Sequence, residues 1–207
     1  MAACWSCQAE AASEPFCAAC GQIQPARPRD PFAWFGLAPR YHLDAANLDK
    51  AWRELSKRLH PDKFARAGAR ERRFALEQST QLNQAYRQLK DPTLRAEHLL
   101  RVNGFAVARD EAGKSGAGER LPLDFYEEVM EDREALIEAK ASGQAEVDVL
   151  ARRVIERRDR TLAGIDQAFT DWEASGRREA LEPAETALAQ MRYYARFLDE
   201  VEGRPHD

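Results

Sequence analysis

DAANLDKAWRELSKRLHPDKF, at residues 44–64, is the stretch that decides the fold of this 207-residue chain. Asp44 is a typical N-cap, and the apolar side chains after it recur at intervals of 4, 3 and 4 residues. That spacing predicts a helix with one buried face. The apolar residues are Leu48, Trp52, Leu55 and Leu59. Pro61 disfavours helical geometry in the residue before it, so we expect the helix to end at His60.

A second helix is expected to fold back on the first. The loop between them spans residues 61–68, and the second helix spans about residues 69–89. Its inward side chains are Phe74, Leu82, Ala85 and Leu89. Antiparallel packing would leave the tripeptide His-Pro-Asp, residues 60–62, at the tip of a helical hairpin. A shorter helix should precede both, because Asp30-Pro31 is a cap followed by a proline at the first helical position.

The first helix of this hairpin also carries a basic face. Its members are Lys50, Arg53, Lys57 and Arg58. Basic charges on an exposed helix are usually only solvated, and His60 in the last turn is favourable against the helix dipole. Each feature alone therefore has a purely structural explanation. A His-Pro-Asp tripeptide that ends a basic amphipathic helix and opens a loop to a second amphipathic helix is far more specific.

This arrangement resembles a J domain, the module by which co-chaperones engage heat-shock ATPases of the DnaK kind. Four stretches of the chain are similar to the HscB form of this module: LHPDKF at 59–64, FGLAPRYHLD at 35–44, LNQAYRQLKDP at 82–92 and RAEHLLRVNG at 95–104. The resemblance covers residues 30–105 closely and residues 120–202 more loosely. It implies that His60, Pro61 and Asp62 trigger ATP hydrolysis in a DnaK/HscA-type partner. It also implies that Lys50, Arg53, Lys57 and Arg58 meet an acidic surface of that chaperone.

All four cysteines lie in the first 20 residues, as two C-x2-C pairs separated by nine residues. They are Cys4, Cys7, Cys17 and Cys20. Two such pairs supply the tetrahedral sulfur shell of a structural zinc, and Gly21 lets backbone amides approach the sulfurs. We expect one structural metal per chain in a knuckle at residues 1–26. This knuckle is too small to fold without its metal, whose loss is expected to unfold residues 1–25 alone.

Three other uses of the cysteines compete with zinc. A redox dithiol needs one C-x-x-C, normally on a helix beside a strand, and no such pattern surrounds these pairs. A disulfide framework needs an oxidising compartment. A tetrathiolate iron site uses the same ligands, so the sequence leaves iron open, although affinity rank and closed geometry favour zinc.

The remaining chain predicts more helices and makes the fold class all-α. A helix at about residues 92–102 offers Leu94, His98 and Leu99 for burial, and a linker rich in glycine and charge follows at 106–120. Helices are then expected at about residues 123–141, 145–172 and 181–201. Their short loops imply an antiparallel three-helix bundle at residues 121–203.

Two apolar ridges run along the first helix of this bundle, about 120° apart at 3.6 residues per turn. The first ridge consists of Phe125, Val129 and Leu136, and the second of Tyr126, Met130 and Ile137. Seven acidic residues and one arginine lie between positions 124 and 138. An apolar ridge lined by carboxylates is either a partner surface or a buried seam, and the pattern alone does not decide.

The resemblance favours a partner surface, because this region of HscB-like proteins binds the iron–sulfur scaffold protein IscU. By alignment the surface comprises Tyr126, Glu127, Met130, Glu131, Glu134 and Tyr193. Glu127 departs from the family pattern, in which an apolar residue is expected. Tyr193 lies about 100° from the inward-facing Tyr194. We therefore expect Tyr193 to be exposed and to have no role in folding.

The charges divide into two segments of opposite sign. Residues 27–109 carry 17 basic and 9 acidic residues, a net charge of +8, and residues 121–207 carry 12 and 21, a net charge of −9. This polarity suggests two modules with different partners.

The longest uncharged stretch, residues 15–26, is too short for a membrane span, which needs about 18 apolar residues. Residues 1–26 contain no lysine or arginine, so no export signal is expected and the predicted location is cytoplasmic.

The sequence therefore predicts an adaptor that holds a DnaK/HscA-type ATPase and an IscU-type scaffold, and not an enzyme. Binding both would raise the effective concentration of the scaffold at the chaperone. A J-domain co-chaperone for general unfolded clients is the alternative. Nucleic-acid binding is not expected, because the +8 segment lacks an aromatic platform and a recognition helix. No Ser/His/Asp arrangement or phosphate loop points to catalysis, and a thiol oxidoreductase is excluded if the four thiolates hold metal.

Overall fold

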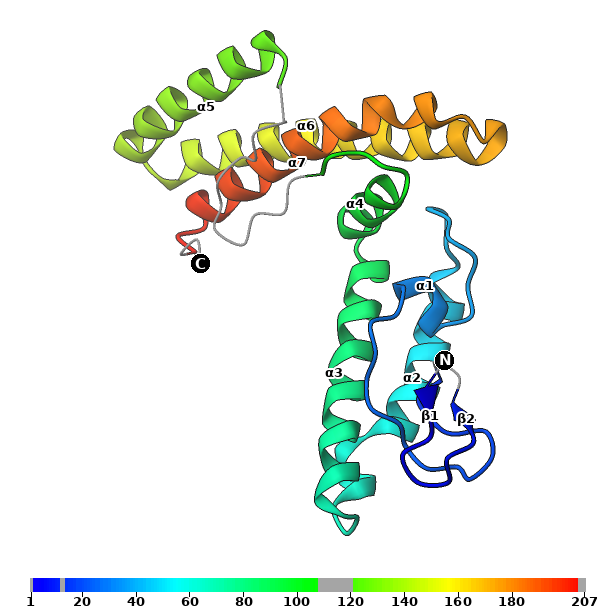
Figure 1. Ribbon diagram of the computed structural model, residues 1–207. Helices are drawn as coiled ribbons and strands as arrows, with labels where there is room; N and C mark the ends of the chain where they lie inside the picture. Colours follow the sequence, from blue (N-terminus) through cyan, green and yellow to red (C-terminus); the bar gives the residue numbers. More distant parts are fainter. Residues whose placement is uncertain (1, 12–13, 108–120, 205–207) are drawn as a thin grey trace. The chain divides into compact units, whose positions relative to one another are not determined.

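The computed structural model describes residues 2–11, 14–107 and 121–204, and these residues form two compact units (Figure 1). The first unit comprises residues 1–95 and the second residues 96–207. Apart from two strands of two residues each, the regular secondary structure of the described residues is helical, so the predicted all-α class is confirmed. Most of the linker expected at residues 106–120 lies outside the described residues.

Three helices and a short turn form the hairpin of the first unit. They are α1 (Pro31–Trp34), α2 (Ala45–Leu59), the 3-10 turn η1 (Pro61–Phe64) and α3 (Ala69–Lys90). Asp44 caps α2 as expected, since its carboxylate accepts hydrogen bonds from the backbone N–H groups of Ala46 and Asn47. The helix stops before His60, whose backbone is extended (φ −58°, ψ 127°) ahead of the proline. The predicted loop begins with one 3-10 turn, because Pro61 presets a helical φ at its own position.

The core of the hairpin includes a residue from the N-terminal segment. Ile23 is 1% exposed and lies in one cluster with five buried side chains of the helices. These are Trp34, Leu59, Ala75, Leu82 and Ala85. Because the cysteine-rich segment shares this core, we no longer expect metal loss to unfold residues 1–25 alone. Figure 1 shows that segment, in dark blue, against α2 and α3.

Helix α4 (Pro92–Val102) follows Asp91, whose carboxylate accepts hydrogen bonds from the backbone N–H groups of Thr93 and Leu94. Its buried residues are Ala96, Leu99 and Leu100. The expectation that Leu94 would be buried is wrong, since 42% of this residue is exposed. Leu94 lies about 200° around the helix from Ala96, which places it opposite the buried face.

The second unit contains the predicted three-helix bundle (Figure 1). Its elements are α5 (Leu123–Ser142), α6 (Gln144–Ser175), the 3-10 turn η2 (Arg178–Leu181) and α7 (Glu182–Val201). Gly143 (φ 129°) and Gly176 (φ 67°) make the turns between the helices, at backbone angles that favour glycine. The largest fully buried side chains include Val154, Ile165, Phe169, Leu181 and Leu188. The buried residues of α7 are Ala184, Leu188, Ala189, Met191, Tyr194 and Phe197.

A buried ion pair that no sequence pattern predicted joins α5 to α6. Asp132 is 4% exposed and pairs with the guanidinium of Arg157, which also lies 2.7 Å from the carboxylate of Glu128. The hydroxyl of Tyr193 on α7 donates to the second carboxylate oxygen of Asp132, over 3.3 Å. One acidic side chain therefore links all three helices of the bundle.

None of the helices in residues 2–11, 14–107 and 121–204 combines the length and apolar character needed to cross a membrane.

Removing one partner of the buried pair should strongly destabilise the bundle. Asp132→Ala would leave the Arg157 guanidinium without its buried partner, and we expect a loss of about 3–5 kcal/mol in the free energy of unfolding. Lys140→Ala is the control, because Lys140 and Glu200 form an exposed pair over 3.4 Å, and its loss should cost less than about 1 kcal/mol. Denaturant titration followed by helical circular dichroism measures both. Equal costs would contradict a structural role for Asp132.

Candidate metal centre and binding surfaces

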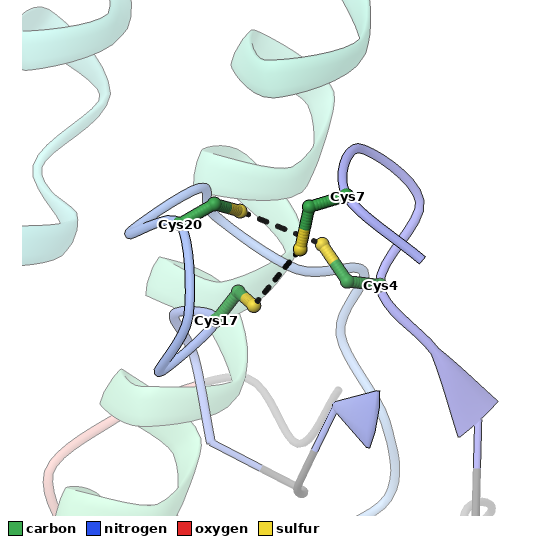
Figure 2. A group of neighbouring side chains, drawn as sticks. All are labelled: Cys4, Cys7, Cys17 and Cys20. Carbon is green, nitrogen blue, oxygen red and sulfur yellow. Dashed lines mark hydrogen bonds between the residues drawn. The ribbon is translucent and has the colours of Figure 1, made fainter. Parts of the chain in front are cut away.

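The four cysteines predicted to bind metal converge on one point. Figure 2 shows the sulfur atoms of Cys4, Cys7, Cys17 and Cys20 turned toward a common centre. All four Sγ atoms lie within 4.8 Å of one another. The Cys4–Cys20 sulfurs are 3.7 Å apart and the Cys7–Cys17 sulfurs 3.8 Å apart. A tetrahedral zinc with Zn–S bonds of about 2.3 Å requires sulfur–sulfur separations of about 3.8 Å, so these residues fit a tetrathiolate metal.

Two similar turns create this geometry. Strands β1 (Ala2–Ala3) and β2 (Glu10–Ala11) pair on either side of the first turn, and a bridge between Phe16 and Ile23 closes the second. In each turn the residue after the second cysteine has a left-handed backbone, with φ 62° at Gln8 and φ 73° at Gly21. Glycine adopts this conformation without strain, as expected for position 21. Gln8 is a non-glycine residue in the same conformation and the sequence did not predict it.

Charge repulsion among the four sulfurs favours the binding of a cation at this cluster. The backbone N–H of Cys7 lowers the pKa of the Cys4 thiol to about 6, against the effect of burial and with help from the N–H of Ser6. At Cys20 the backbone N–H of Gln22 also lowers the thiol pKa, but burial and the other three sulfurs outweigh it and raise the pKa to about 12. The first thiolate therefore opposes formation of the others. A bound divalent cation removes this conflict by binding all four as thiolates.

A buried glutamine links the metal centre to the hairpin. Gln24 is 2% exposed, and its side-chain amide donates to the Cys4 sulfur over 3.3 Å. Its backbone carbonyl accepts a hydrogen bond of 3.0 Å from the side chain of Gln78 on α3. Hydrogen bonds of this kind orient a thiolate ligand and stabilise its charge. No local pattern marked Gln24 or Gln78, because their roles depend on a contact between residues 54 positions apart.

The His-Pro-Asp tripeptide lies at the exposed tip of the hairpin. Asp62 has 90% of its side chain exposed and His60 has 55% exposed. The Nδ1 atom of His60 accepts the backbone N–H of Asp62 over 3.3 Å and lies 3.5 Å from the Asp62 carboxylate. These contacts order the turn locally and leave the carboxylate available to a partner.

The four basic residues of α2 are exposed, as an interaction surface requires. They are Lys50, Arg53, Lys57 and Arg58. Two of them make contacts within the chain: Arg53 lies 3.8 Å from the Asp49 carboxylate, and the Arg58 guanidinium lies 5.0 Å from the ring centre of Phe16. The structure thus places the basic residues on the helix that ends directly before His60.

The two apolar ridges of α5 have different environments. Phe125 and Leu136 of the first ridge are 3% exposed and face the bundle core. Tyr126, Met130 and Ile137 of the second are 49%, 60% and 71% exposed, respectively. The carboxylates expected beside the second ridge, those of Glu127, Glu131 and Glu134, are exposed as well. We call the face formed by Tyr126, Met130, Ile137 and these three glutamates the α5 face.

Tyr193 differs from the other residues proposed for scaffold binding. The expectation that it has no role in folding is wrong, because its hydroxyl donates to the buried Asp132. Its ring packs against Phe125 at 5.5 Å between centroids and also contacts Tyr194 and Phe197. Burial and the nearby Asp132 charge raise the pKa of Tyr193 well above that of a free tyrosine. Periodicity along α7 could not reveal the contacts with Asp132 and Phe125, since these two residues belong to α5.

Comparisons with known proteins agree with this architecture. A family model described as the HscB C-terminal oligomerisation domain matches residues 121–202. A co-chaperone protein HscB homolog from Vibrio vulnificus strain YJ016 is 34% identical over 175 residues, covering 83% of this chain and 94% of the relative. The homolog from Neisseria meningitidis serogroup C strain FAM18 is 33% identical over 171 residues, with coverage of 82% and 93%.

Solved structures give the same result. The chaperone HscB from Vibrio cholerae matches with a TM-score of 0.65 and 32% identity, over 84% of this chain and 96% of that structure. Human co-chaperone protein HscB matches with a TM-score of 0.77 over 97% and 96%, and at 24% identity this likeness supports the fold alone. Together the matches define a helical co-chaperone. The chain belongs to the HscB family.

Loss of one sulfur ligand should release the metal and loosen the hairpin. We expect wild-type protein to carry about one metal ion per chain and the Cys17→Ser variant to carry almost none. Because Ile23 and Gln24 join the cysteine turns to the hairpin, the variant should also lower the unfolding temperature of the first unit. Elemental analysis and thermal unfolding measure the two effects. Metal-free wild-type protein with a Cys4–Cys7 disulfide that cycles would instead support a redox role.

Proposed function

We propose that this chain is an adaptor of iron–sulfur cluster assembly that acts without catalytic activity of its own. Its hairpin binds a DnaK/HscA-type chaperone and stimulates ATP hydrolysis there, and its C-terminal bundle delivers an IscU-type scaffold protein. The observation that supports this function best is the exposed His-Pro-Asp tip at the end of a basic helix, within a chain of the HscB family. We propose a cytoplasmic location for this activity.

The chaperone arm of the proposal uses two kinds of contact. The charges of Lys50, Arg53, Lys57 and Arg58 would steer the encounter with an acidic surface, an effect that acts mainly on the association rate. Asp62 would then place its exposed carboxylate beside an arginine of the ATPase, while His60 and Pro61 hold the turn that presents it. The tip is therefore a switch for a reaction that takes place in the partner.

The scaffold arm uses the α5 face. Tyr126 and Met130 offer apolar anchors, and Glu127, Glu131 and Glu134 surround them with negative charge. An apolar centre with a charged rim is the usual composition of a specific protein interface. Tyr193 would contribute partly through its hydrogen bond to Asp132 and its ring contact with Phe125, which fix α5 within the bundle. General binding of unfolded clients is a weaker alternative, because a dense acidic rim selects for a partner of complementary charge.

The metal proposed for the cysteine site is zinc, with a structural role. Cys4, Cys7, Cys17 and Cys20 would hold it, while Gln24 and the N–H of Ser6 donate hydrogen bonds to the Cys4 sulfur. Zinc favours closed tetrahedral sulfur sites, and four thiolate ligands leave no open position for a substrate.

Asp62→Asn should abolish stimulation of the chaperone ATPase without changing the stability of the protein. The carboxylate is 90% exposed, so the fold gains little from its charge. Single-turnover ATP hydrolysis by a purified DnaK-type chaperone, with and without the variant, measures the effect. The double variant Lys50→Ala/Arg53→Ala should weaken association by about tenfold at low salt and less at high salt. Arg152→Ala/Arg153→Ala removes the same charge from α6 and is the matched control. Full stimulation by the Asp62→Asn protein would exclude the hairpin tip as the trigger.

Truncations on the α5 face should weaken scaffold binding and spare stability. We expect Tyr126→Ala and Met130→Ala each to lower the affinity for an IscU-type scaffold by about tenfold or more, as anchor residues do. Their melting temperatures should stay near that of the wild type, because both side chains are exposed. Tyr193→Ala should lower affinity and stability together, since it removes a ring from the α5–α7 contact. Titration calorimetry and thermal unfolding separate these effects, with Glu138→Ala as the control. Wild-type affinity in both the Tyr126 and Met130 variants would place the scaffold elsewhere.

A further inference from the structure

The two cysteine turns each contribute one aromatic side chain to a contact with the hairpin. Trp5 lies between the ligands Cys4 and Cys7, and Phe16 directly precedes Cys17. The guanidinium of Arg70 lies 5.1 Å from the Trp5 ring centre, and that of Arg58 lies 5.0 Å from the ring centre of Phe16. A guanidinium at this distance over an aromatic face is a cation–π contact.

The two arginines in these contacts lie at the two helix ends that flank the hairpin tip. Arg58 is in the last turn of α2, which ends at Leu59, and Arg70 is in the first turn of α3, which begins at Ala69. The segment between these helix ends is residues 60–68, which starts with the His-Pro-Asp tripeptide. The cysteine turns therefore contact both ends of the segment that triggers the partner.

Further contacts fix the two aromatic rings to the same core. The indole N–H of Trp5 donates to the carbonyl of Ile23 over 2.7 Å, and its ring packs edge-on against Phe74 of α3 at 6.2 Å. Phe16 packs against the cluster that contains Ile23 and Leu59, and so does Phe64 of the 60–68 segment. The ring positions are thus set on one side by the cysteine turns and on the other by the hairpin.

The 60–68 segment has mostly local hydrogen bonds of its own. The N–H of Lys63 donates to His60, and the N–H of Ala67 donates to Phe64. Such bonds shape a turn but do not fix its direction relative to the helices that flank it. Besides the packing of Phe64 against the core, the direction depends on how firmly the last turn of α2 and the first turn of α3 are held together. Phe16 contacts Arg58 in the first of these turns, and Trp5 contacts Arg70 in the second.

We propose that the metal-bound cysteine turns act as a clamp on the hairpin tip, with Trp5 and Phe16 as positioning residues for the His60–Asp62 trigger. The clamp reduces the motion of the 60–68 segment before the chaperone binds, so less conformational entropy is lost on binding. Metal occupancy thereby controls how well the chain engages its chaperone. This inference rests on the proposed function for its effect on the ATPase, whereas its effect on loop motion stands independently.

The test compares metal-loaded, full-length wild-type protein with the double variant Trp5→Ala/Phe16→Ala. Amide hydrogen exchange of residues 60–68 should be roughly five- to thirtyfold faster in the variant, as expected from the loss of two cation–π contacts. The concentration that half-maximally stimulates a DnaK-type ATPase should rise by a similar factor. Metal content and affinity for the scaffold should not change. Chelation of the metal from wild-type protein should reproduce the faster exchange.

Two further variants keep the test decisive. Trp172→Ala removes a partly buried aromatic residue from α6 in the second unit and should leave the exchange of residues 60–68 as in the wild type. If the double variant loses its metal or unfolds the hairpin, Arg70→Gln removes one clamp contact while keeping both rings, and it should still speed exchange. Unchanged exchange in the double variant with metal retained, or in Arg70→Gln, would overturn the clamp. Failure of the wild type to stimulate the ATPase would instead reject the proposed function and leave the exchange result valid.

Discussion

The arrangement of the first unit depends on one backbone constraint, which is that Pro61 prevents α2 from continuing. It ends α2 at Leu59, where the basic face would otherwise run on, and turns the chain so that α3 returns along the same apolar side. Because the turn is external, Asp62 remains 90% exposed, and the cysteine-rich segment can pack against both helix ends. One backbone restriction thus produces both the exposed tip and the place where the metal centre attaches.

Sequence alone predicted the features that depend on local chemistry. The cap at Asp44 and the stop before Pro61 set the bounds of α2, and two C-x2-C pairs identified the four cysteines that the structure brings together. Two of the errors involve contacts between distant segments. Tyr193 has a folding role because α5 supplies Asp132 and Phe125, and Ile23 extends the cysteine segment into the hairpin core. Periodicity reports which face of a helix is apolar but not which element covers it, so these contacts could not be predicted.

The charge division of the chain fits an adaptor with two unlike partners. The basic residues near the tip and the acidic residues along α5 belong to separate compact units, and each unit has its own core. A partner of one sign attracted to one arm would be repelled by the other, which lowers the chance that either arm captures the wrong protein. Under the proposed function the two arms would therefore not compete for one surface, and a single chain would bind both proteins together.

The most direct test of this adaptor function is complementation between two variants that each lack one arm. Asp62→Asn protein keeps the α5 face, and Tyr126→Ala/Met130→Ala protein keeps the hairpin tip. The measurement is the increase in ATP hydrolysis by a DnaK-type chaperone when an IscU-type scaffold is added at a limiting concentration. If one chain must hold both partners, the wild type gives a large increase, and an equimolar mixture of the variants gives no more than the Tyr126→Ala/Met130→Ala protein alone. Restoration of the wild-type increase by the mixture would contradict the adaptor, because the arms would then work equally well apart.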